Sequence, residues 1–133
     1  MTFDDATKAT KKGDVLSIRH ALEDGLDPNL TNRYDWTLLM DAAMNGNTAI
    51  GRLLIGHGAD LDRKNRFGDT ALSLAAHTGH PSFVKLLLER GVVLDASFEG
   101  FLDWAEKYGT GSREAMVSTR AAIKAALAAR LSE

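Results

Sequence analysis

The sequence predicts an all-α fold in which pairs of short antiparallel helices stack side by side. Residues 65–97 repeat the pattern of residues 32–64 when Asn65 is aligned with Asn32. In this alignment the residue types that recur at equivalent positions are Asn, Arg, Thr, Leu, Ala-Ala, Gly, Leu-Leu, Gly, Leu and Asp. Each copy contains two short segments with apolar residues at helical spacing, and each segment is followed by a glycine, which commonly ends helices. Two helices this short cannot cover their own apolar side chains, so the copies must pack against one another.

Length and composition indicate one soluble domain. The chain has 133 residues, of which 44% are hydrophobic and 26% charged, as is typical of a globular protein with a buried core. The formal net charge of −2 gives no overall reason to bind nucleic acid or an anionic membrane. Cysteine is absent, no apolar run is long enough to span a bilayer, and Met1–Asp14 has no apolar core of a signal peptide. We therefore expect a cytoplasmic monomer that binds neither nucleic acid, membrane nor cofactor.

Residues 1–31 are expected to form a degenerate repeat that caps the N-terminal end of the stack. Phe3–Lys12 predicts a short helix with two aspartates in its first turn, where negative charge favours the helix dipole. Val15–Leu22 has apolar residues at helical spacing and predicts a second helix. In the register of the later copies Gly13 aligns with Gly46, and Gly25 aligns with Gly58, so this repeat is in phase with the others.

Residues 32–64 and 65–97 are the two full repeats. Thr37 is the expected start of the first helix of the earlier one, because threonine caps helix N-termini. Gly51 and Gly56 both fall inside the second helix, where a glycine costs about 1 kcal/mol relative to alanine. Close packing or a local softness of the helix would explain their presence. The loops that precede the first helices are expected to project as hairpins.

Residues 98–133 are expected to form a shortened repeat that caps the C-terminal end. The register of the central repeats would align Leu72 with Ala105, whereas the best match aligns Leu72–Gly79 with Leu102–Gly109. Three residues are therefore missing from the preceding hairpin. Trp104 and Ala105 then fall at positions expected in the core.

The last helix is expected to be the longest. Ser112 would cap its start, and it would end near Leu131 with an apolar stripe that closes the stack. The alternative interpretation makes this alanine-rich helix a docking segment for a partner.

The central repeats share a motif with a known family. Threonine, leucine and alanine recur at one spacing, as Thr37, Leu39 and Ala42 and again as Thr70, Leu72 and Ala75. The second copy continues with Gly79-His80, Val84-x-Leu86-Leu87 and a terminal Gly91. This pattern resembles the ankyrin repeat, whose motif is Thr-Pro-Leu-His-x-Ala, with the proline and histidine replaced here. The resemblance covers roughly residues 4–110 and implies a solenoid that acts as a non-catalytic protein-protein interaction module, as inhibitor or adaptor.

The resemblance also implies where a protein partner would bind. Ankyrin repeats present hairpin tips and the exposed positions of the first helices on their concave side. Carried onto this sequence, the hairpin positions are Arg33, Tyr34, Trp36, Arg66, Phe67 and Asp69, and the helix positions are Met44, Asn45, His77 and Thr78. Lys11, Lys12, Lys107 and Tyr108 would extend this surface at its two ends. Tyrosine, tryptophan and arginine are the residues enriched in interface hot spots.

The hairpin aromatics differ in what they indicate. Trp36 is the sharper signal, because its counterpart in the next repeat is Asp69 and the packing of repeats therefore does not require an aromatic residue there. Tyr34 and Phe67 match each other across the repeat, and the alternative is that they stack to stiffen neighbouring hairpins.

A small-molecule or metal site at His77 and His80 is the alternative function. Their i, i+3 spacing could bring two imidazoles together, but Gly79 breaks the helix that would hold them on one face. His80 is instead expected to cap the second helix. Gly109–Ser112 lacks the lysine and the preceding strand of a phosphate-binding loop, and no nucleophile or metalloprotease motif is present. We therefore expect no enzyme activity.

Overall fold

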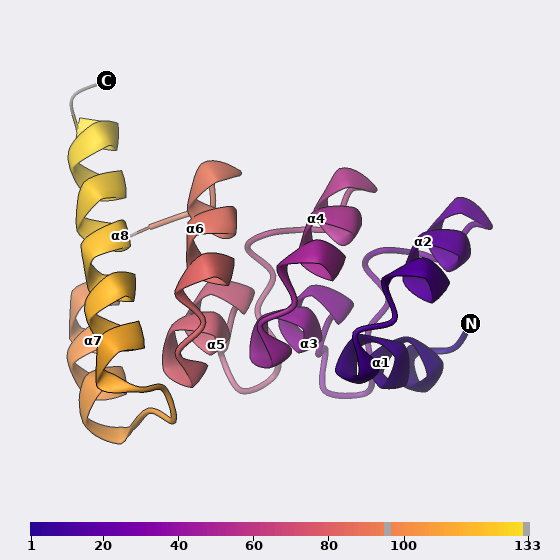
Figure 1. The fold of residues 1–133 in the computed structure, drawn as a ribbon, viewed down its shortest axis with the longest axis horizontal. Helices are drawn as coiled ribbons and strands as arrows, with labels where there is room; N and C mark the ends of the chain where they lie inside the picture. Colours follow the sequence, from indigo (N-terminus) through magenta and orange to yellow (C-terminus); the bar gives the residue numbers. More distant parts are fainter. Residues whose placement is uncertain (95–96, 132–133) are drawn as a thin grey trace.

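The computed structural model describes residues 1–94 and 97–131, which form eight α-helices arranged as four pairs. The pairs are α1 (Phe3–Lys12) with α2 (Val15–Glu23), α3 (Leu38–Asn45) with α4 (Thr48–Gly56), α5 (Ala71–Thr78) with α6 (Pro81–Glu89), and α7 (Ser97–Tyr108) with α8 (Arg113–Leu131). The odd-numbered helices form one layer and the even-numbered helices a second, and the pairs follow one another in chain order (Figure 1). The prediction of an all-α stack is confirmed.

Regular strands do not occur in the two described ranges. The only β-type pairing there is an isolated antiparallel bridge between Thr31 and Thr37, at the base of a hairpin. No helix of the described ranges is long and apolar enough to cross a membrane.

The first helix of each of the first three pairs begins and ends in the same way. At each start a threonine hydroxyl accepts a hydrogen bond from the backbone N–H three residues later, at 3.1 to 3.2 Å, in Thr2, Thr37 and Thr70. At each end a glycine adopts the left-handed conformation, with φ of 72°, 66° and 75° in Gly13, Gly46 and Gly79. The threonine and glycine spacing of the sequence therefore fixes the length of these helices.

The hairpins are built on asparagine side chains. The Oδ1 atom of Asn32 accepts hydrogen bonds from the N–H groups of Tyr34 and Trp36, and Asn65 does the same for Phe67 and Asp69. Successive hairpins are linked, because the N–H of Arg66 donates to the carbonyl of Tyr34 at 2.9 Å. This link sets the spacing of the hairpin tips.

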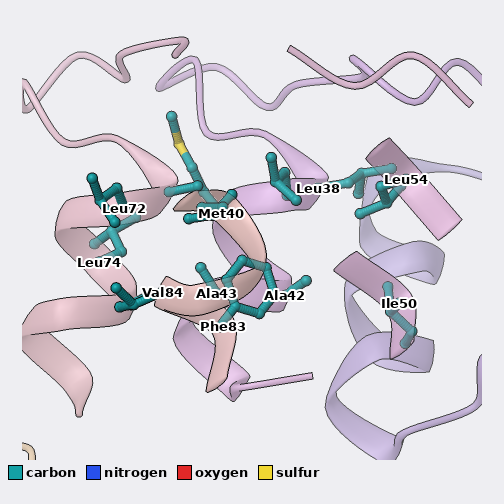
Figure 2. Close-up of a cluster of buried hydrophobic side chains, with 14 of the residues drawn as sticks. Leu38, Met40, Ala42, Ala43, Ile50, Leu54, Leu72, Leu74, Phe83 and Val84 are labelled. Carbon is teal, nitrogen blue, oxygen red and sulfur yellow. The ribbon is translucent and has the colours of Figure 1, made fainter. Parts of the chain in front are cut away.

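The core lies between the helix pairs as well as within them. Small alanines on α3 and α5, including Ala42, Ala43, Ala75 and Ala76, are fully buried and let these helices pack closely together. Large side chains fill the space towards the second layer, with Ile50 and Leu54 on α4 and Phe83 and Val84 on α6 (Figure 2). Apolar side chains are therefore covered mainly by the neighbouring pair.

At Gly51 this packing leaves no room for a side chain. A Cβ atom placed there would come within 2.7 Å of the ring of Phe83, which is itself fully buried. At Gly56, further along the same helix, a Cβ atom would meet nothing within 4 Å. Close packing thus explains the first glycine but not the second.

Trp104 is not in the core, and the prediction that placed it there is wrong. Its side chain is 48% exposed, whereas Leu74, at the equivalent position of the preceding repeat, is 6% exposed. Leu74 is covered because α7 packs against α5, and among the described residues no further first-layer helix covers α7 in turn. Ala105, the other expected core residue, is buried.

The last helix closes the second layer. Ser112 caps it as predicted, because its Oγ atom accepts a hydrogen bond from the N–H of Ala115 at 3.1 Å. The guanidinium of Arg120 donates to Asp103 and Glu106 of α7, both at 2.9 Å, and that of Arg130 donates to the carbonyl of Val92 at 2.6 Å. The predicted apolar stripe stops before Leu131, which is 87% exposed.

We expect Gly51→Ala and Gly56→Ala to change stability in opposite directions. Overpacking against Phe83 should make Gly51→Ala less stable by about 1–2 kcal/mol, despite the higher helix propensity of alanine. Gly56→Ala should be more stable by about 0.5–1 kcal/mol, because the added methyl group meets only solvent. Urea unfolding monitored by circular dichroism measures both. A Gly51→Ala variant as stable as the wild type would contradict the packing described for Phe83.

Candidate functional site

The hairpin tips bring four of the predicted binding residues together. The ring centres of Tyr34 and Phe67 lie 5.7 Å apart in a tilted contact. The two rings therefore touch across neighbouring hairpins, as the alternative interpretation expects. The guanidinium of Arg33 lies 4.8 Å from the centre of the Tyr34 ring. Arg66 forms an ion pair of 3.5 Å with Asp35 of the preceding hairpin. Because Phe67 is still 66% exposed, this contact leaves most of its ring open to solvent.

The two residues at the base of the hairpins are less accessible than the tips. Trp36 and Asp69 are both half-buried, and Trp36 packs against the hydrophobic core. Truncation of Trp36 would therefore remove core contacts as well as surface, and it is a weaker probe of binding than the sequence indicated.

The predicted helix positions lie along the first-layer helices. Lys11, Lys12, Met44 and Asn45 are exposed, His77 and Thr78 are half-buried, and Lys107 and Tyr108 are exposed. Two of them are held by their own helices, because the hydroxyl of Thr78 donates to the carbonyl of Leu74 and the amide of Asn45 to that of Asp41. We use the name inner strip for the helix positions above, the hairpin tips and Trp104. Its members are Lys11, Lys12, Arg33, Tyr34, Met44, Asn45, Arg66, Phe67, His77, Thr78, Trp104, Lys107 and Tyr108.

Aromatic side chains gather at the α7 end of the inner strip. Trp104 stacks on His77 of α5 at 5.1 Å between ring centres, and it lies 5.9 Å from Phe101 and 6.0 Å from Tyr108. The Nζ atom of Lys107 is 5.3 Å from the centre of the Tyr108 ring. His77, Phe101, Trp104 and Tyr108 form what we call the aromatic row, in which Tyr108 is 59% exposed.

Trp104 and Phe101 were missed as binding candidates by the sequence analysis. The signal was present, because residues 101, 104 and 108 are spaced so that they share one helix face. Of these three residues the sequence analysis assigns only Trp104 to the core, and it places Tyr108 on the binding surface.

A match to a family model now identifies the fold. Residues 7–97 match a model of ankyrin repeats in three copies. The chain belongs to the ankyrin repeat family. Proteins of this family are typically non-catalytic, and their repeats generally bind other proteins.

A solved structure resembles most of the stack. The crystal structure of the human ASB11 ankyrin repeat domain superposes with a TM-score of 0.74 at 22% sequence identity, over 90% of this chain and 52% of that one. This chain therefore spans about half the length of that ankyrin domain, and at this identity the likeness concerns the fold. No curated protein matches the sequence.

The two histidines of the alternative function are engaged separately in the ankyrin stack. The Nε2 atom of His80 lies 3.0 Å from the carbonyl oxygen of Met44, in the preceding repeat. His80 is the N-cap residue of α6, as expected, but its side chain forms no capping hydrogen bond with that helix. His77 stacks on Trp104, and its Nδ1 atom is buried. In the described part of the chain no three metal-ligating side chains gather in one place.

A cavity of about 340 Å³ lies beside the start of α7. Leu72, Val92, Phe98 and Phe101 are among its lining residues, together with Asp62 and Lys64. Phe101 belongs both to the lining of this cavity and to the aromatic row, so the two features are adjacent.

Asp41 is the one strongly perturbed acid near the inner strip among the described residues. Burial raises the pKa of its carboxyl from 3.8 to about 6, against the attraction of the Lys11 ammonium, which lowers the pKa. Its Oδ2 atom is buried, and no described residue donates a hydrogen bond to it. The ionised carboxylate is therefore an energetic cost to the folded ankyrin domain.

We expect Asp41→Asn to stabilise the protein above pH 6. The folded state holds the Asp41 proton more tightly than the unfolded chain, so wild-type stability falls as pH rises through the interval from 3.8 to about 6. The variant avoids this loss and should be more stable at pH 7.5 by about 1 kcal/mol, a value reduced from the full shift because solvent still reaches the side chain.

Thermal unfolding between pH 4 and pH 8 measures the effect. The advantage of Asp41→Asn should disappear near pH 4, and Glu89→Gln, an exposed acid on α6, should show no such dependence. A variant less stable than the wild type at pH 7.5 would contradict the burial described for Asp41.

Proposed function

We propose that this ankyrin domain is a non-catalytic module that binds a partner protein through its inner strip. The observation that carries the proposal is the aromatic row, which leaves Trp104 and Tyr108 about half exposed on a packed helix. Exposed large aromatics on a rigid scaffold are the residues most enriched in interface hot spots. The family assignment supports the same mode of action.

The inner strip would bind by complementarity of shape and charge, with no chemical step. Its side chains project from helices and linked hairpins that are already ordered, so association costs little conformational entropy. The binding residues proposed from the sequence are Arg33, Tyr34, Trp36, Met44, Asn45, Arg66, Phe67, Asp69, His77, Thr78, Lys107 and Tyr108, and the geometry of α7 adds Trp104.

The whole chain would act as one binding unit. We propose that residues 1–31 and 98–133 are the end repeats and that 32–64 and 65–97 are the central ones. Either an inhibitor or an adaptor would use this surface. Loss of the partner's own activity on binding identifies an inhibitor, and simultaneous capture of a second protein identifies an adaptor.

We expect the double variant Trp104→Ala/Tyr108→Ala to lose partner capture. Immobilised protein is exposed to lysate of its source cell, and proteins retained by the wild type are quantified on each variant by mass spectrometry. Removal of two hot-spot aromatics should lower retention of the partner by at least about tenfold. The free energy of unfolding should change by no more than about 1–2 kcal/mol, because about half of each side chain is exposed.

The matched control is Leu16→Ala/Val117→Ala, which removes two exposed apolar side chains from the second-layer helices α2 and α8. Its capture should equal that of the wild type. Equal capture by the Trp104→Ala/Tyr108→Ala variant, if it is folded, would contradict the proposed function.

A further inference from the structure

The charge of the inner strip is opposite to that of the chain. The chain carries a formal net charge of −2, yet basic side chains dominate the strip, namely Lys11, Lys12, Arg33 and Lys107. Lys8 joins them, because in the register of the repeats it holds in α1 the position that Asp41 holds in α3.

The acidic groups near the strip are largely occupied. Asp35 is paired with Arg66, and Asp103 and Glu106 are paired with Arg120. Asp41 and Asp69 are half-buried. Asp5, Asp14 and Asp41 lie close enough to Lys8, Lys12 and Lys11, respectively, to attract them electrostatically. Within residues 1–94 and 97–131 these three lysines nevertheless form no ion pair, so their ammonium groups remain open to a partner.

Three of the strip's four lysines lie at one end and the aromatic row lies at the other, where Lys107 is the remaining lysine. Lys8, Lys11 and Lys12 belong to α1, whereas Trp104 and Tyr108 belong to α7, three helices further along the same layer (Figure 1). Packed helices are about 8–10 Å apart, so the two ends are separated by about 25–30 Å. An extended chain rises about 3.3 Å per residue and crosses that distance in about eight residues.

We propose that the occupant of the inner strip is an extended segment of the partner protein with an acidic cluster at one end and an apolar side chain about eight residues away. The acidic cluster contacts the lysines of α1, and the apolar side chain contacts the aromatic row on α7. This inference rests on the proposed function and adds the chemistry of the partner to it.

The arrangement fits such a segment better than a single-stranded nucleic acid. Nucleic-acid grooves interleave cations and aromatic rings along their length, so that successive bases stack while successive phosphates are neutralised. Here a cation accompanies a ring at two places, Arg33 at Tyr34 and Lys107 at Tyr108. The rings of the aromatic row, however, contact one another at 5.1 to 6.0 Å instead of alternating with cations, and three of the four lysines lie at the far end.

A phage-displayed library of random peptides, long enough to cross the strip, tests the proposal. The full chain is immobilised and the selected peptides are sequenced, synthesised and measured by fluorescence anisotropy. We expect selected sequences to share an acidic cluster and an apolar residue separated by about eight positions. Trp104→Ala/Tyr108→Ala should weaken their affinity by about 30-fold, and Lys11→Gln/Lys12→Gln by about fivefold, with the second effect reduced at high salt.

The control for charge is Lys85→Gln/Lys124→Gln, which removes the same net charge from the second-layer helices and should leave affinity unchanged. Peptides without an acidic cluster, no enrichment of any peptide, or tighter binding of a fluorescent oligothymidylate than of the selected peptides would each overturn the inference. The proposed function is tested separately. It is contradicted if the Trp104→Ala/Tyr108→Ala variant captures the cellular partner as well as the wild type does.

Discussion

Stacking of helix pairs is the constraint on which the rest of this structure depends. Each first-layer helix is short, and it packs against the neighbouring pairs as well as against its own partner helix. Ala43 and Ala76 let α3 and α5 approach closely, and Gly51 makes room for the Phe83 ring from the next pair. A single pair would leave these apolar surfaces in water, so folding and the alignment of the pairs are one event.

The same constraint places exposed aromatic surface at the end of the stack. Leu74 is buried because a further first-layer helix covers it, while Trp104, one repeat later, has no such cover in the described structure. The apolar residue at this position of α5 serves the core, whereas the equivalent residue of α7, the last first-layer helix described, faces solvent. A tryptophan there, stacked on His77 and close to Tyr108, is better suited to contact with another protein than leucine would be.

Much of the fold could be predicted from the sequence because its signals are local. Threonine caps, left-handed glycines and the serine before α8 each determine hydrogen bonds within a few residues, and the caps at Thr37 and Ser112 form as expected. The environment of Trp36, Trp104 and His80 could not be predicted in this way. Each depends on what the neighbouring repeat places against it, namely the core beneath Trp36, the open side of α7, and the carbonyl of Met44 beside His80. A repeat register identifies equivalent positions, but it does not state whether a neighbour covers them.

Hydrogen exchange of the protein with and without its captured partner tests the central claim most directly. If stacking creates the binding surface, protection should increase in the hairpin tips and in the C-terminal halves of α1, α3, α5 and α7, while α2, α4, α6 and α8 remain unchanged. Protection confined to the second-layer helices would show that the partner binds the opposite side and would contradict the account.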